Sequence, residues 1–114
     1  MTAPPRVSAL VVARNEAARL PGCLESLAPA DELVVVLDRS TDGSAAVASR
    51  ALCRGGAARV LEGAWELEGE RRNAGIAACT GDWVLEVDAD ERVPPELWEA
   101  VRRVSAASPH GFHR

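Results

Sequence analysis

The sequence contains no lysine, because all 13 of its Lys and Arg residues are arginine. A phosphate-binding P-loop needs a lysine beside the phosphates, and Schiff-base catalysis needs a side-chain amine. Both classes of protein are therefore excluded. Histidine is nearly absent as well, since His110 and His113, close to the C-terminal end, are the only two. A Ser-His-Asp or Cys-His centre inside the domain is therefore not expected.

Positive charge and long apolar runs are also scarce. The net charge is −4, whereas general nucleic-acid binding needs a basic face. No apolar run approaches the roughly 20 residues of a membrane span, and MTAPPRVSALVVARNE shows no signal-peptide pattern. Cys23, Cys53 and Cys79 form no CxxC motif, which predicts buried free thiols in a reducing compartment. We therefore expect a cytoplasmic chain that does not bind nucleic acid.

Apolar runs alternate with helix signals along the 114 residues, a length that suits one domain. Runs of the buried-strand type predict strands at residues 7–13, 32–38, 58–61 and 82–88. Apolar spacing, cap residues and flanking Gly or Pro predict helices at residues 16–27, 40–56, 68–79 and 94–105. This order predicts an α/β fold, a three-layer α/β/α Rossmann-like parallel sheet in a single domain over residues 1–114.

Acidic residues follow the last predicted strand in the segment VLEVDADERV. Asp88 and Asp90 are two residues apart, and because the backbone turns at a strand end, both carboxylates can reach one cation. Hard divalent cations prefer such oxygen ligands and complete their shell with water and substrate phosphates. The alternative is a solvated strand end whose acids favour the N-terminus of the next helix. Ligands of parallel sheets bind outside the carboxyl ends of the strands, which is where these acids lie.

Polar residues that follow the other strands each have a structural alternative. Asp38 ends the second strand and suits a ribose hydroxyl or a base N–H, whereas Asp42 suits the cap of the next helix. Glu16, in the loop after the first strand, is also a favourable first charge for a helix. Arg71 and Arg72 fit a solvated helix face. The three tryptophans fit the core better than ligand stacking; they are Trp65, Trp83 and Trp98.

The segments VVARNEA, LVVVLDRSTDGS and ERRNAGIAACTGDWVLEVDADERV, in this order, resemble the nucleotide-binding half of family 2 glycosyltransferases with the GT-A fold. The resemblance runs from Val7 to about Leu97 and is nearest to the inverting sugar transferases of lipopolysaccharide-core and surface-glycan synthesis. It implies the N-terminal half of a GT-A fold. It also implies an enzyme that uses a nucleotide-sugar donor, most often a uridine diphosphate sugar, and is cytoplasmic or peripheral at the inner membrane face.

The resemblance also assigns roles to residues. Asp88 and Asp90 match the DxD motif that holds Mg²⁺ or Mn²⁺ on the donor diphosphate, and Asp88 also faces the donor. Asp38 matches the acid that reads the base or ribose, and Arg72 would face the nucleotide. The loop after the first strand lines the nucleotide pocket; its residues are Arg14, Asn15 and Glu16.

The resemblance implies further that a second half binds a glycan or lipid-linked acceptor and supplies the catalytic base, which cannot be assigned here. We therefore expect 1–114 to be an incomplete glycosyltransferase domain. A sugar-nucleotide-binding remnant without transferase activity is the alternative. A dehydrogenase is not expected, because ARNEAARLPG lacks the G-x-G-x-x-G motif. Phosphatases with a DxD motif carry it on the first strand and need a lysine.

Overall fold

The computed structural model describes residues 6–39, 42–43, 46, 48 and 57–107. Its centre is a parallel sheet of four strands in the order β3-β2-β1-β4. Three of the four strands begin and end within one residue of the predicted bounds, and β3 is longer at both ends. The strands are β1 Val7–Ala13, β2 Glu32–Asp38, β3 Ala57–Gly63 and β4 Trp83–Asp88.

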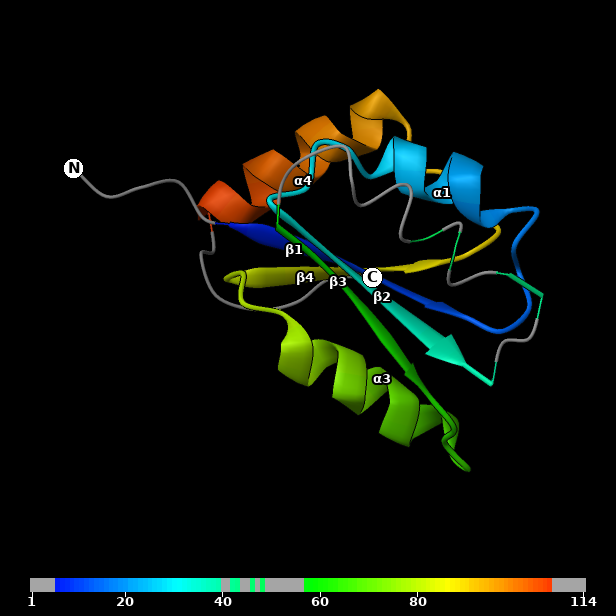
Figure 1. Ribbon diagram of the computed structural model, residues 1–114. Helices are drawn as coiled ribbons and strands as arrows, with labels where there is room; N and C mark the ends of the chain where they lie inside the picture. Colours follow the sequence, from blue (N-terminus) through cyan, green and yellow to red (C-terminus); the bar gives the residue numbers. More distant parts are fainter. Residues whose placement is uncertain (1–5, 40–41, 44–45, 47, 49–56, 108–114) are drawn as a thin grey trace.

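Helices cover both faces of this sheet, which confirms the predicted three-layer α/β/α architecture (Figure 1). Helices α1 and α4 lie on one face and α3 lies on the other. Their bounds are Leu20–Ser26 for α1, Glu68–Ala78 for α3 and Pro95–Ala107 for α4. The helix predicted for residues 40–56 lies largely outside the described residues. None of the described helices has the length and apolar content needed to cross a membrane.

The first helix is shorter than predicted. The sequence favoured a helix from Glu16, but α1 begins at Leu20. Residues 16–19 form a turn, in which the N–H groups of Arg19 and Leu20 donate to the Glu16 carbonyl at 3.0 and 2.9 Å. The chain thus needs one extra turn to move from the end of β1 onto the face of the sheet.

Side chains of β1, one of the two inner strands, alternate between two apolar layers, as a strand buried on both faces requires. Val11 pairs with Val35 on one side and Val87 on the other, and all three are buried toward α1 and α4. Leu10 points to the opposite layer, where it packs with Val36. The residue patterns that predicted buried strands are therefore explained by helices on both faces.

Gly75 allows α3 to pack closely on its face of the sheet. A Cβ atom at this position would lie 2.5 Å from Leu10 Cδ1 and 2.9 Å from Val36 Cγ2. The glycine lowers helix propensity, but it lets the helix backbone rest directly on side chains of β1 and β2. Gly75 is therefore a point of close contact between α3 and the sheet.

The amino edge of the sheet is closed by hydrogen bonds within the protein. The Glu32 carboxylate, in a residue that is 3% exposed, accepts from Ser8 Oγ at 2.8 Å. It also accepts from the N–H and the hydroxyl of Thr80 at 2.7 and 2.9 Å, and Gly81 N–H donates to Ser8 Oγ. Because these polar groups already satisfy one another, the amino edge offers little to a ligand. The candidate site therefore lies at the opposite edge.

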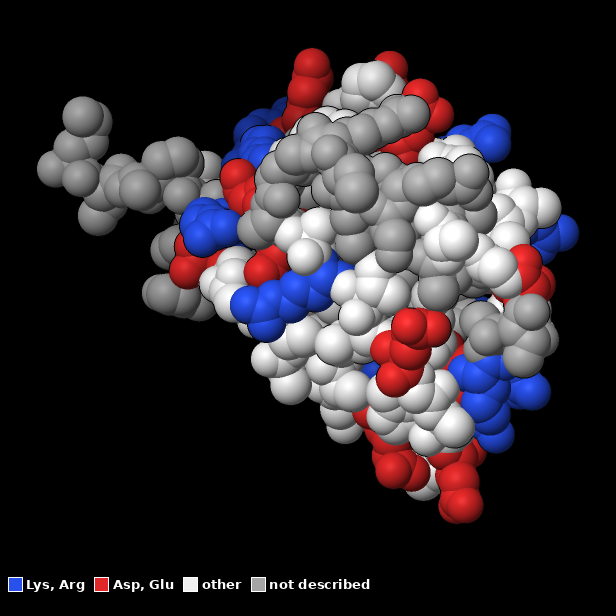
Figure 2. Space-filling view, in the orientation of Figure 1, with Lys and Arg blue, Asp and Glu red and all other residues white. Residues whose placement is uncertain are grey.

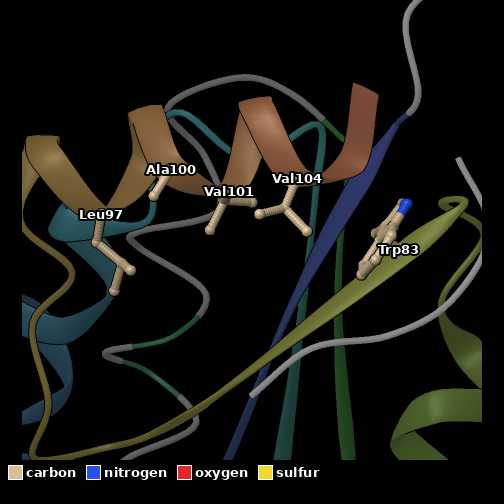
Figure 3. A pocket seen from close by; sticks show the side chains of 5 residues that line it. All are labelled: Trp83, Leu97, Ala100, Val101 and Val104. Carbon is tan, nitrogen blue, oxygen red and sulfur yellow. The ribbon is translucent and has the colours of Figure 1, made fainter. Parts of the chain in front are cut away.

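A shallow hollow of about 50 Å³ lies between α4 and the start of β4 (Figure 3). Figure 3 shows Val101 and Val104 pointing from α4 toward the sheet, with Trp83 on β4. The side chains around it are apolar: Trp83, Leu97, Ala100, Val101 and Val104. A hollow with so few polar groups has little with which to orient a charged nucleotide.

Candidate functional site

The carboxyl ends of three strands meet at one edge of the sheet. Val12 of β1 pairs with Val36 of β2 and with Asp88 of β4. Asp38 lies two residues after Val36 on β2, and it pairs with Gly63 of β3. The predicted site residues after β1, β2 and β4 are therefore brought to one edge, as parallel strands require.

The turn after β4 presents its acidic side chains to solvent. Asp88 and Asp90 are exposed, whereas Ala89 between them is 5% exposed and packs in the core. The Asp88 N–H donates to the Glu91 carboxylate at 2.8 Å, and the Glu91 N–H donates back to the Asp88 carbonyl at 2.9 Å. Glu91 thus closes the turn, and the two aspartates lie on its outer side.

The chemistry of this pair suits a divalent cation bound together with a substrate. Mg²⁺ in phosphate-transferring sites takes one or two carboxylates and completes its shell with phosphate oxygens and water. The described residues contain no group of three or more His, Cys, Asp or Glu side chains that could hold a metal alone. Binding of a cation by Asp88 and Asp90, shared with a diphosphate, stays a prediction.

The carboxylates of this turn affect a buried thiol next to it, that of Cys23. Cys23 of α1 donates from Sγ to the Asp88 carbonyl at 3.5 Å. Burial, together with the charges of Glu91, Asp90 and Asp88, raises the pKa of the Cys23 thiol to about 11. The thiol is therefore protonated at neutral pH, and three carboxylates act on it together. Cys23 and Cys79 are free thiols, as predicted, but only Cys23 is buried and Cys79 is half-buried. Cys53 lies outside the described residues.

The loop after β1 turns sharply at the same edge. Asn15 has a φ of 52°, in the left-handed region, and both Arg14 and Asn15 are exposed. Glu16 is half-buried and lies 3.6 Å from Arg19. The Asp42 carboxylate accepts from Ala17 N–H at 3.0 Å. It thus supports the turn before α1, a contact that the predicted role as cap of the following helix did not include.

Asp38 is buried in a cluster of donors rather than open to solvent. The residue is 1% exposed. Its Oδ1 accepts from Arg39 Nε at 3.1 Å and from Trp65 N–H at 3.2 Å, and its Oδ2 accepts from an Arg71 Nη atom at 3.0 Å. Arg39 also donates to the Trp65 carbonyl at 2.6 Å. The cluster ties together the ends of β2 and β3 and the first turn of α3.

These contacts keep the Asp38 carboxylate charged. Burial opposes its ionisation, but hydrogen bonds from Arg39, the Trp65 N–H and Arg71 outweigh burial and hold the pKa of Asp38 below its usual value. A carboxylate has about four acceptor positions, and three donors already use this one. A nucleotide contact at Asp38 would therefore use the remaining position or displace one of the arginines.

Arg71, rather than Arg72, is the arginine of α3 that reaches the Asp38 cluster. Arg72 is half exposed, and its Nε lies 4.0 Å from the Glu86 carboxylate on β4. A nucleotide contact by Arg72 stays a prediction. Sequence reasoning treated Arg71 as a solvated side chain. Its position in the first turn of α3, close to the carboxyl edge, is the signal that points to its role.

The tryptophans lie in or against the core, as predicted. Trp83 and Trp98 are 8% and 5% exposed, and Trp65 packs half-buried against the apolar layer beneath α3. In the view of Figure 2, described arginines are interspersed with acidic side chains and form no continuous basic patch. That the chain does not bind nucleic acid stays a prediction.

The four-stranded parallel sheet with helices on both faces is the α/β arrangement found in GT-A glycosyltransferase structures. The family model of glycosyl transferase family 2 matches residues 8–110, and the chain belongs to this family. The resemblance that the strand-end motifs indicated is thereby confirmed.

Curated relatives include a lipopolysaccharide core biosynthesis glycosyltransferase, LpsC, of Rhizobium meliloti, with 33% identity over 102 residues. A TPR repeat-containing protein of Synechococcus elongatus is 39% identical over 99 residues, and the putative glycosyltransferase EpsH of Bacillus subtilis is 30% identical over 105. These alignments cover 90%, 85% and 89% of the chain but only 38%, 23% and 30% of the relatives. The chain therefore spans well under half of each relative.

Two solved structures share the fold over most of the chain. A mannosyltransferase from Pyrobaculum calidifontis, in complex with GDP-Man and Mn²⁺, has a TM-score of 0.79 and 26% identity. Residues 1–349 of TarS from S. aureus give a TM-score of 0.77 and 25% identity. The similarity covers 94% and 88% of this chain, and 33% and 32% of the two structures.

Proposed function

We propose that this chain is the donor-binding part of a glycosyltransferase that transfers a sugar from a nucleoside diphosphate with the help of Mg²⁺ or Mn²⁺. The observation that carries the proposal is the exposed pair Asp88 and Asp90 at the end of β4, level with the ends of β1 and β2. The structural neighbour that binds GDP-Man and Mn²⁺ supports the same assignment.

In this proposal each part of the carboxyl edge has a separate task. Asp88 and Asp90 hold the cation, which neutralises the charge that develops on the departing diphosphate. The loop of Arg14, Asn15 and Glu16 lines the nucleotide. Arg71 and Arg39 orient the charged carboxylate of Asp38 beside the base or ribose. Arg72 contributes positive charge next to Glu86, on the side of the sheet that α3 covers.

The donor that we propose is a uridine diphosphate sugar, and the acceptor is a glycan or lipid-linked saccharide. The lipopolysaccharide-core relative supports a role in surface-glycan synthesis, which would place the protein in the cytoplasm or at the inner face of the membrane. Acceptor binding and the catalytic base are assigned to sequence beyond the regions matched here, since the chain spans at most 38% of the relatives described above.

Calorimetric titration with UDP and with GDP, each with Mn²⁺ and with a chelator, tests this proposal. We expect binding of one nucleotide that is much tighter with Mn²⁺ than with the chelator. Equal binding under both conditions would remove the metal from the proposal. A lack of binding by either nucleotide would overturn donor binding itself.

A further inference from the structure

The loop between β4 and α4 is anchored to helix α1 at both of its ends. At the β4 end, the Cys23 thiol donates to the Asp88 carbonyl at 3.5 Å. At the α4 end, the Val93 N–H donates to Ser26 Oγ at 3.0 Å. Cys23 and Ser26 are one turn apart on α1, so a single turn of helix contacts both ends of the segment that carries Asp90.

Ser26 is the centre of this anchor because three hydrogen bonds meet there. Its hydroxyl donates to the Cys23 carbonyl at 2.6 Å, which orients the oxygen to accept from Val93. Its own carbonyl accepts from the Trp98 indole N–H at 2.8 Å. Ser26 therefore fixes the loop relative to α1 and to the first turn of α4 at the same time.

Apolar packing and close approach reinforce these hydrogen bonds. Ala89 and Val93 are 5% and 6% exposed and belong to the core cluster that contains Cys23. The Arg92 side chain lies directly over Gly22, where a Cβ atom would be 2.3 Å from an Arg92 Nη atom. The loop is thus buried at Ala89 and Val93 and exposed between them, and Asp90 is held between two anchored residues.

We propose that Ser26 is a positioning residue for the Asp88 and Asp90 carboxylates, an inference that rests on the proposed metal-dependent donor binding. A metal ligand on a loop binds well only when the residues behind it hold its geometry closely. The contacts from Cys23 and Ser26 tie the backbone on both sides of Asp90 to α1. Ser26 acts through that backbone and does not touch the nucleotide.

Hydrogen exchange in the 114-residue chain tests the anchor without any ligand. In Ser26→Ala the Val93 N–H loses its acceptor, and we expect the Glu91 and Val93 amides to exchange about fivefold faster, the effect of one ordinary hydrogen bond. Ser26→Thr keeps the hydroxyl and should restore protection. Ser105→Ala is the matched control, because the Ser105 hydroxyl also donates to the carbonyl three residues earlier, within α4. Unchanged exchange in Ser26→Ala would overturn the anchor.

Nucleotide titration of the same variants tests the link to metal binding. Mn²⁺ should increase the affinity of the unaltered chain for UDP or GDP, and we expect this increase to be about 10-fold smaller in Ser26→Ala. In the presence of chelator, the affinity of the variant should stay within about twofold of that of the unaltered chain. Cys23→Ala, which removes the contact at the other end of the loop, should act in the same direction even if Ser26→Ala folds poorly. If the unaltered chain gains no affinity from Mn²⁺, the proposed function fails and this link with it. If it gains affinity and the variants gain equally, only the role of Ser26 is overturned.

Discussion

Arg71 on α3 donates to the Asp38 carboxylate at the end of β2 at 3.0 Å, and this contact joins two segments 33 residues apart. Asp38 is 1% exposed, so the ion pair lies within the protein and is little screened by solvent. It sits directly behind the carboxyl edge that is proposed to bind the donor. The contact therefore holds the end of β2 against α3 without any ligand.

Asp38→Asn should destabilise the fold, because the amide carries no charge for Arg39 and Arg71 and turns a donor group toward one of them. We expect a loss of about 3 kcal/mol in the free energy of unfolding, measured by urea denaturation. Glu62→Gln, which changes an exposed carboxylate near the end of β3, is the control and should have little effect. Equal stability of the two variants would show that the Asp38 cluster contributes nothing to folding.

Acid should weaken the fold through three carboxylates. Burial opposes ionisation of Asp31, Glu32 and Asp38, but hydrogen bonds to each outweigh it, so each pKa lies below its ordinary value of 3.8 or 4.5. A lowered pKa in the folded state adds stability above that ordinary value, and the addition is lost as pH falls through the folded pKa. Urea midpoints should therefore hold steady at neutral pH and fall steeply below about pH 4.

Glu32→Gln should flatten that acid dependence, because the amide cannot be protonated in the same range and Glu32 would no longer contribute. The variant will also be less stable at pH 7, since Ser8 and Thr80 donate to the carboxylate. A stability curve of Glu32→Gln that runs parallel to the curve of the unaltered chain would contradict this account.

Two glycines in α3 should respond in opposite directions to the same change. Gly75→Ala places a methyl group 2.5 Å from Leu10 Cδ1, and we expect it to cost about 1–3 kcal/mol by forcing the helix from the sheet. Gly69→Ala meets nothing within 4 Å and should stabilise the helix by about 0.5–1 kcal/mol. Thermal unfolding of both variants measures the difference. If Gly75→Ala were as stable as Gly69→Ala, α3 would not pack as described.

The fold followed from the sequence because its strands are buried on both faces. Apolar runs such as VSALVVA and ELVVVLD left no exposed side, so helices had to cover both, and the order of elements required a parallel sheet. Helix ends were harder to predict. The turn at residues 16–19 depends on the Asp42 contact with Ala17, a tertiary interaction that no local pattern carries.

The sequence predicted where the residues of the candidate site lie in the fold, but not which residues they contact. Asp38, Asp88 and Asp90 could be placed at one edge, because carboxyl ends of parallel strands meet there. Which arginine of α3 reaches Asp38 depends on the helix's rotation over the sheet, and Gly75 sets how closely that helix lies. The role of Ser26 could not be predicted from the sequence for the same reason, because it depends on a hydrogen bond from Val93, 67 residues away.

Glycosyl transfer should not be observed with the 114-residue chain alone. Inverting transfer needs a base within hydrogen-bond reach of the acceptor hydroxyl, and positioning of the acceptor contributes about 7–11 kcal/mol to such reactions. We expect donor binding and at most slow hydrolysis of the nucleotide sugar. Product analysis with labelled UDP-sugars and a panel of saccharide acceptors checks this. Formation of a glycoside by the chain alone would show that acceptor binding lies within it.

The measurement that tests the account most directly is the Mn²⁺-dependent affinity for nucleoside diphosphate of the unaltered chain and of Asp90→Asn. Asp90 is exposed, so the variant should keep its thermal midpoint while the affinity gained from Mn²⁺ falls at least about 10-fold. Glu96→Gln, another exposed acid a few residues along the chain, should keep the full gain. A folded Asp90→Asn variant that gains as much from Mn²⁺ as the unaltered chain would contradict the metal site at the end of β4.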